Sequence, residues 1–251
     1  MQFGDALRDW RDRRRRSQLD LSLSANVSAR HISFLETGRA RPSRSMVLAL
    51  CAELDVPRPD RNRLLVAAGF APLYRARDWQ AEDMAPARAA MEYMLTSHAP
   101  FPGLALDRHW RILRMNAPAA RLFGLFGIDE GDAMLTTMLE NPALLEAIEN
   151  LPDLAAHLAA RLRTESAHLG GDAALETYAD KFSQLTADGT QPDGSLPAFV
   201  PTRIRLGGAR LSFLSTIAQF GTAEDIALAE LRVELMFPAD EATRAALATP
   251  I

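Results

Sequence analysis

Cysteine is almost absent from this sequence, which has Cys51 and no other cysteine among its 251 residues. A single thiol excludes an internal disulfide framework and a cysteine-based metal site, and it is typical of proteins in a reducing compartment. No stretch of about 18 apolar residues occurs, so the sequence predicts no membrane-spanning helix. The N-terminus, MQFGDALRDWRDRRRR, is charged from Asp5 onward and lacks the apolar segment of a secretion signal. These absences favour a cytoplasmic location.

Signatures of catalysis and of metal binding are also missing. The glycines at 124, 127 and 131 do not have the strand-to-helix spacing of a phosphate-binding loop, and there is no G-x-S-x-G elbow or Cys/His pair. Four scattered histidines lack metal-ligand spacing, so solvated or packed side chains are favoured over a metal or haem site. They are His98, His109, His157 and His168. We therefore expect neither an enzyme nor a cofactor.

Charge is divided unevenly along the chain. Residues 1–79 hold 15 Arg, no Lys and 9 acidic residues, a net charge of +6, whereas residues 80–251 hold 13 basic and 23 acidic residues, a net charge of −10. This asymmetry favours a basic module that meets a polyanion, although chance clustering of arginine is the alternative. The run Arg13–Arg16 has two interpretations, a patch that follows phosphates or the solvated end of a helix.

The first 69 residues have the pattern of five short helices. Apolar side chains at i, i+4 and i+7 predict a helix from Phe3 to about Arg15, and Ser17 with Asp20 predicts a capped second helix. Asn26 suits the tight turn that follows. The third helix begins at Ser28 and stops at Gly38, the fourth opens at Pro42-Ser43, and the fifth runs from Pro59 to Gly69. Cys51 is interpreted as a small core residue of this all-α domain, with a redox-sensing thiol as the alternative.

The second and third helices have the composition of a helix-turn-helix. Ile32 and Leu35 suffice to seat the third helix, which leaves its other face polar for base edges and phosphates. Arg30 is best suited to a guanine edge or a phosphate, and Arg39 and Arg41 follow the helix where a loop contacts the DNA backbone. The predicted DNA contacts are Gln18, Ser28, Ala29, Arg30, His31, Ser33, Phe34, Thr37, Arg39 and Arg41.

This stretch resembles the XRE-type, or lambda-repressor-like, helix-turn-helix family. The matching residues are Ser17-Gln18, Val27-Ser28, Ile32-Ser33, Leu35-Glu36-x-Gly38 and Pro42-Ser43. The sequence departs from the family pattern at Asn26, where Gly is usual, and at Ser22, where Ala is usual. The resemblance covers about 60 residues and implies sequence-specific binding of double-stranded DNA, generally by a homodimer on an inverted repeat.

The rest of the chain predicts a linker and then an α+β domain. Residues 71–86 mix prolines, charges and isolated aromatics, and Ala87–Ser97 has a helical pattern. Residues 104–107 and 110–115 predict two short strands, Asn116 starts a helix, and residues 130–188 are mostly helical. Residues 202–206 and 209–220 predict a hairpin with a Gly-Gly turn, and 228–237 predicts a half-buried strand. Asn116 is interpreted as a helix cap or a partner of a strand backbone rather than a ligand contact.

This second domain, residues 87–251, resembles the PAS-like ligand-binding half of MmyB-like regulators. The matching stretches are FPGLALDRHWRILRMNAPAARLFG (101–124) and LSFLSTIAQFGTAEDIALAELRVELMFPAD (211–240). The predicted strands form a small antiparallel sheet, and we expect this domain to dimerise. The resemblance implies a mostly apolar pocket for a fatty-acid-like ligand. The predicted ligand contacts are Leu106, Met115, Phe213, Ile217, Leu231 and Val233; the alternative places the apolar stripe in a packed core.

The sequence therefore predicts a helix-turn-helix domain at 1–70, a linker at 71–86 and a PAS-like domain at 87–251. The predicted function is a cytoplasmic, nucleoid-associated transcription regulator that binds DNA as a homodimer and senses a small apolar ligand. The alternative is an antitoxin or scaffold whose acidic domain holds a protein partner. A closed apolar cavity favours sensing, whereas a large exposed apolar patch favours the scaffold.

Overall fold

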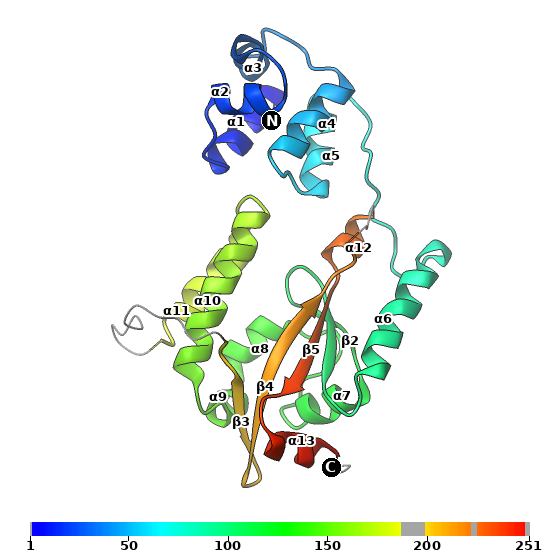
Figure 1. Ribbon diagram of the computed structural model, residues 1–251, viewed down its shortest axis with the longest axis vertical. Helices are drawn as coiled ribbons and strands as arrows, with labels where there is room; N and C mark the ends of the chain where they lie inside the picture. The colour runs from blue at the N-terminus through cyan, green and yellow to red at the C-terminus, as the bar shows by residue number, and fades with distance from the viewer. Residues whose placement is uncertain (1, 187–198, 222–224, 249–251) are drawn as a thin grey trace. The chain divides into compact units, whose positions relative to one another are not determined.

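The computed structural model describes residues 2–186, 199–221 and 225–248 (Figure 1). They divide into two compact units. The first unit contains the N-terminal part of the chain up to Ala76 together with Thr164–Ala173. The second contains Arg77–Arg163 and most of the remaining C-terminal part.

Five short helices form the N-terminal part, as the sequence predicts. They are α1 (Phe3–Arg13), α2 (Gln18–Ser24), α3 (Ala29–Glu36), α4 (Arg44–Glu53) and α5 (Arg58–Ala67). Ser17 and Asp20 form the predicted capping box, in which the Asp20 N–H donates to Ser17 Oγ at 3.0 Å and the Ser17 N–H donates to Asp20 Oδ2 at 2.9 Å. Asn26 adopts the left-handed conformation, with φ of +54°, in the turn between α2 and α3. Local side-chain chemistry therefore sets the ends of these helices.

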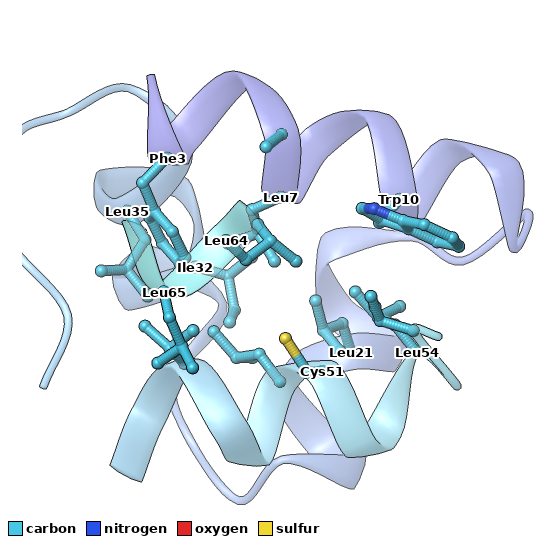
Figure 2. Close-up of a cluster of buried hydrophobic side chains, with 14 residues drawn as sticks. Phe3, Leu7, Trp10, Leu21, Ile32, Leu35, Cys51, Leu54, Leu64 and Leu65 are labelled. Atoms are coloured by element: carbon cyan, nitrogen blue, oxygen red, sulfur yellow. The ribbon is translucent and has the colours of Figure 1, made fainter. Parts of the chain in front are cut away.

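Apolar side chains from all five helices meet in one hydrophobic core (Figure 2). Phe3, Leu7, Trp10, Leu21, Ile32, Leu35, Cys51, Leu54, Leu64 and Leu65 are among its members. Cys51 is only 2% exposed, and burial raises the pKa of its thiol to about 12. Since the thiolate is the reactive form of cysteine, this finding supports the interpretation of Cys51 as a core residue.

The second unit is built on a five-stranded antiparallel sheet with the order β2-β1-β5-β4-β3. The strands are β1 (Gly103–Leu106), β2 (Ile112–Met115), β3 (Thr202–Leu206), β4 (Ala209–Ala218) and β5 (Arg232–Pro238). Together with the helices around the sheet, this confirms the predicted α+β fold. The β3–β4 hairpin has the predicted two-residue turn, because Leu206 pairs with Ala209 and both intervening glycines have positive φ, +52° at Gly207 and +88° at Gly208.

Helices lie on both faces of the sheet (Figure 1). On one face α6 (Ala85–Ser97) packs Met91 and Leu95 against Ala105, Leu231 and Val233. Because side chains alternate across a strand, Leu104 and Leu106 of β1 point to the opposite face. The elements that complete this unit are α7 (Ala117–Gly124), α8 (Met134–Glu140), α9 (Pro142–Ala147), α10 (Leu151–His168), α11 (Ala173–Ser183), α12 (Ile226–Glu230), α13 (Glu241–Ala248) and the 3₁₀ turn Glu82–Met84. The last turn of α10 belongs to the first unit.

Several element bounds differ from the sequence-based prediction. Strand β2 begins at Ile112 rather than at residue 110, and β4 ends at Ala218 rather than at residue 220. Residues 228–237 are not one strand: α12 occupies Ile226–Glu230 and β5 begins at Arg232. The reason is that the alternation begins only at Glu230, while IALAE consists of good helix formers. The helix predicted from Ala87 begins at Ala85, and α13 lies beyond any predicted element. Predicted helical residues 187 and 188 lie outside the described residues.

Asn116 holds several backbone segments of this unit together. Its Oδ1 accepts hydrogen bonds from the Ala119 N–H at 2.9 Å, which caps α7, and from the Gly103 N–H at 3.0 Å. Its Nδ2 donates to the carbonyl oxygens of Leu95 and Phe101, both at 2.9 Å. The structure thus confirms both backbone interpretations of Asn116.

Candidate functional site

Helix α3 is anchored on one side and open on the other. Ile32 and Leu35 are at most 1% exposed and face the interior. Ser28 begins the helix by accepting the His31 N–H at 3.1 Å, and Thr37 ends it by donating from Oγ1 to the Ser33 carbonyl at 2.8 Å. The two residues predicted to seat the helix are therefore buried, as its sparse apolar composition requires.

The opposite face of α3 gathers most of the predicted DNA contacts. Arg30, Thr37, Arg39 and Arg41 are exposed, as is the capping residue Ser28. Ala29, His31, Ser33 and Phe34 are half-buried. Residues one helical turn apart lie above one another, so positions 29, 33 and 37 form one row and 30 and 34 form the next. The result is a polar, arginine-rich surface on the helix and on the loop that follows it.

Glu36 is a buried carboxylate that connects the first three helices. Its side chain has no exposed surface, and it accepts hydrogen bonds from Arg11 Nε at 2.6 Å, Arg8 Nε at 3.4 Å and Gln18 Nε2 at 2.8 Å. Burial by itself raises the pKa of Glu36, but the hydrogen bonds from Arg11 and Gln18 outweigh burial and hold the pKa below its ordinary value. The charged network therefore fixes the position of α3 relative to α1 and α2.

Gln18, predicted to contact a DNA phosphate, donates a hydrogen bond to Glu36 within the protein. It is half-buried at the start of α2, and one of its two amide protons is used by Glu36. The amide has a second N–H, so a phosphate at the N-terminus of α2 stays a prediction. Sequence spacing gave no sign of the Glu36 network, because its members come from three different helices.

Three arginines of the run Arg13–Arg16 bind backbone carbonyl oxygens at or just after helix ends, namely Arg13, Arg14 and Arg16. Arg14 donates to the carbonyls of Leu54 and Asp55, both at 2.8 Å, after the end of α4, and Arg16 donates to the Glu53 carbonyl at 2.8 Å. Arg13 and Arg14 also donate to carbonyl oxygens of residues 167–170, which belong to the same unit. Cations stabilise the negative end of a helix dipole, so this run has a structural use that neither sequence-based interpretation included.

The second unit contains an apolar cavity of about 240 Å³. Its walls come from β1, β3, β4, β5 and from α7 to α10, on the face of the sheet opposite α6. Most of the lining is aliphatic or sulfur-containing, with three aromatic side chains. The apolar members among these are Leu104, Leu106, Trp110, Phe123, Met134, Met138, Leu144, Ile148, Leu154, Leu158, Phe199, Val200, Ile204, Leu214 and Met236.

A few polar side chains also line the cavity. His157 and Arg161 come from α10, and the Arg161 guanidinium lies over the Trp110 ring, 4.2 Å from its centroid. Burial, and secondarily the charge of Arg161, lowers the pKa of His157, so the imidazole is held neutral to lower pH than usual. Ser215 and Glu234 contribute from the sheet. A mostly apolar wall with few polar groups is the usual composition of a small-molecule site.

The structure places the predicted ligand contacts in three different environments. Leu106 lines the cavity. Phe213, Leu231 and Val233 are buried, the last two in the cluster beneath α6. Met115 is half-buried at the end of the edge strand β2, and Ile217 is 38% exposed on β4. Leu106 therefore borders the cavity and the other five lie in the core or nearer the surface, while their role as ligand contacts stays a prediction.

Sequence reasoning missed the contribution of α10 to this cavity. Leu154, His157, Leu158 and Arg161 follow the spacing i, i+3, i+4 and i+7, which places them on one face of a helix. That pattern was available in the sequence. The spacing pattern could not show that this face of α10 borders a cavity rather than a packed core.

Across residues 2–186, 199–221 and 225–248, no three His, Cys, Asp or Glu side chains converge as a metal site. Within the same ranges no helix combines the length and hydropathy that crossing a bilayer requires.

A short helix with an exposed arginine-rich face, held by a second helix across a tight turn, defines the class of helix-turn-helix proteins. Comparison with protein families agrees, since residues 2–64 match a helix-turn-helix domain. Residues 87–249 match the MmyB-like transcription regulator ligand binding domain, which covers well over half of the chain. No curated protein is similar enough to this chain to count as a match. The chain belongs to the family of MmyB-like transcription regulators, and it is a DNA-binding regulator with a ligand-binding domain.

Proposed function

We propose that this regulator is a homodimer that recognises an inverted-repeat operator through α3 and responds to a small, mostly apolar ligand in the cavity of the second unit. Residues 1–70 then bind DNA, residues 87–251 sense the ligand and dimerise, and residues 71–86 join them. The protein acts in the cytoplasm on nucleoid DNA. The observation that carries this proposal is the exposed face of α3, where Arg30 and its neighbours surround a helix seated by only two apolar residues.

The proposed DNA interface follows from the geometry of that face. Arg30 and Ser33 face outward from the helix body and suit base edges in the major groove. Thr37, Arg39 and Arg41 follow toward and beyond its C-terminal end, where backbone phosphates run beside a recognition helix. The remaining proposed contacts are Gln18, Ser28, Ala29, His31 and Phe34. In a dimer the two copies of α3 must lie about 34 Å apart to enter successive major grooves.

The proposed ligand is small and largely apolar, of the fatty-acid type. The cavity volume of about 240 Å³ lies below the range of roughly 300–1,000 Å³ that drug-sized ligands occupy, which favours a compact molecule. His157 and Arg161 offer a polar end for such a ligand, and Leu106 remains a proposed contact from the sheet. Ligand binding regulates the protein if it favours one separation of the two copies of α3 over another.

Selection from random double-stranded DNA tests the DNA half of the proposal. The full chain is expected to enrich an inverted repeat whose half-site centres are about one helical turn apart. If no sequence is enriched relative to a shuffled library, the protein does not recognise a specific DNA sequence. Enrichment of a single half-site contradicts the dimeric arrangement.

Native mass spectrometry of the purified full chain tests the ligand half, since it reports the oligomeric state and any retained small molecule together. The variant Leu214→Trp places a large ring at a half-buried position of the cavity wall, so it should lose the retained molecule. Leu125→Trp is the matched control, because Leu125 is 60% exposed and lies outside the cavity wall. If both variants retain the same molecule, the cavity is not its site. Recovery of a stable protein partner instead of a small molecule favours the scaffold alternative.

A further inference from the structure

Two arginines from different backbone segments converge on the ring of Phe34. The Cζ atom of Arg30 lies over this ring, 5.1 Å from its centroid. The Cζ atom of Arg39 lies over the same ring, 6.0 Å from its centroid. Both distances are within the range in which a guanidinium is attracted to the electron-rich face of an aromatic ring. A single half-buried side chain therefore contacts two exposed cations.

The local sequence explains this convergence. Arg30 and Phe34 are four residues apart on α3, so their side chains lie above one another on the helix surface. Gly38, with φ of +72°, then reverses the chain, and the Ala40 N–H donates to the Phe34 carbonyl oxygen at 3.1 Å. This hydrogen bond holds the loop beside the last turns of α3. Arg39, in the loop after α3, is thereby brought back over the Phe34 ring.

The chemistry of the stack leaves both arginines competent to bind an anion. Stacking uses the planar face of a guanidinium, whereas its N–H groups lie at the edge and stay available for hydrogen bonds. The arginines on α1 differ in this respect, because Arg8 and Arg11 donate to the carboxylate of Glu36. The ring is uncharged, so it orders Arg30 and Arg39 without neutralising them.

We propose that Phe34 is a positioning residue, which holds Arg30 and Arg39 in the arrangement in which the two guanidiniums bind DNA. This inference rests on the proposed function of α3. A long arginine side chain loses conformational freedom when it binds, and prior ordering on a ring reduces that loss. Because the same ring orders both side chains, the contributions of Arg30 and of Arg39 to the free energy of DNA binding both depend on Phe34.

The test is a double-mutant cycle on the enriched operator with the full chain. Phe34→Leu keeps an apolar side chain but removes the ring, and it should weaken binding roughly 5- to 30-fold, as expected when two side chains lose their ordering. Phe34→Tyr keeps the ring, so Arg30→Ala and Arg39→Ala should each cost the same factor in the Phe34→Tyr background as in the wild type. Arg30→Ala and Arg39→Ala should each cost a smaller factor in the Phe34→Leu background than in the wild type. The slope of log Kd against log salt should not change in Phe34→Leu, since no charge is removed.

Two controls separate this inference from the proposed function. Circular dichroism checks that Phe34→Leu folds, with Phe34→Met as a second non-aromatic variant. NMR of the protein without DNA should show ring-current shifts of the Arg30 and Arg39 Hδ protons in the wild type and in Phe34→Tyr, and their loss in Phe34→Leu. If these shifts are present but the protein binds no DNA, the stack exists and the proposed function is wrong. The positioning proposal then fails with it.

Another outcome is that the protein binds DNA while the losses from Phe34→Leu and from each arginine variant simply add in free energy. That result leaves the proposed function intact and overturns the positioning proposal. A further outcome also overturns it: a loss in Phe34→Leu that is confined to one A·T pair and independent of both arginines. In that case the ring contacts a thymine methyl group directly.

Discussion

The backbone of Gly4 in α1 lies directly against the end of α3 at Glu36. A Cβ atom added to Gly4 would stand 2.5 Å from the Glu36 carbonyl oxygen and 2.7 Å from that of Leu35. Real Cβ atoms do not approach a carbonyl oxygen this closely, so only glycine permits the two helices to pack as they do. The position of the recognition helix therefore depends on the absence of one methyl group in another helix.

Gly4→Ala should destabilise the N-terminal unit by about 1–2 kcal/mol, although helix propensity alone predicts stabilisation of about 1 kcal/mol. The matched control is Gly124→Ala at the end of α7, where an added Cβ meets nothing within 4 Å. That variant should be neutral or slightly more stable. Hydrogen exchange resolved by peptide measures both effects, and it should show faster exchange in α1 and α3 only for Gly4→Ala. Equal behaviour of the two variants contradicts the close approach.

Glu36→Gln should destabilise the same unit by about 3–5 kcal/mol at neutral pH, because it leaves the guanidinium of Arg11 without its buried carboxylate. Glu53→Gln, at the C-terminal end of α4, serves as the control, since Glu53 contributes its backbone carbonyl to Arg16. Chemical denaturation at pH 7 compares the two variants. Similar losses in both show that the Glu36 network does not stabilise the fold.

The lowered pKa of Glu36 also predicts a pH dependence. The folded-state pKa lies below the unfolded value of about 4.3, so the unfolded chain binds more protons between the two values. The stabilising contribution is complete above the unfolded pKa and is lost as the pH falls through the folded pKa. Unfolding free energies measured from pH 7 to pH 3 should therefore fall more steeply below about pH 4.3 in the wild type than in Glu36→Gln. Parallel curves contradict this assignment.

Arg30→Ala and Arg41→Ala should affect DNA binding differently. Loss of a bidentate contact to guanine costs about 1–3 kcal/mol of discrimination, so Arg30→Ala should relax the preference at one base pair. Arg41→Ala should weaken binding to all sequences and reduce the salt slope by about 1, as expected for one lost phosphate contact. Binding isotherms on the enriched operator and on single-base variants, at several salt concentrations, measure both effects. A change of salt slope alone in Arg30→Ala reassigns Arg30 to a phosphate.

Asn116→Ala should destabilise the second unit by about 2–4 kcal/mol. It removes the cap of α7 and leaves the buried carbonyl of Leu95 and N–H of Gly103 without their partner. Asn141→Ala is a matched control, since Asn141 caps α9 in the same way but is half-buried rather than buried. Its loss should be about 1 kcal/mol. Urea denaturation that shows equal losses contradicts the importance of the buried bonds of Asn116.

Short-range features of this protein could be predicted because they depend on neighbouring residues. Ser17, Ser28 and Asn116 cap helices through hydrogen bonds that span three residues, and Gly207-Gly208 makes a turn that only positive φ angles permit. The helix-turn-helix and its exposed face followed from such signals. The strand predicted at 228–237 was wrong at its start, where α12 extends to Glu230. Local helix formers stabilise α12, and a search for alternation does not detect them.

The five N-terminal helices, the α+β class of the second domain and the family resemblance could all be read from the sequence, because caps, turns and periodicity are encoded within a few residues. The partners of Gln18, Arg13 and Arg14 became visible in the folded protein, because they lie on or just after other helices, far away in the sequence. The tertiary structure also decided which apolar residues surround a cavity and which fill a core. Leu104 and Ala105 are adjacent in β1, yet one borders the cavity and the other packs under α6, because a strand sends successive side chains to opposite faces.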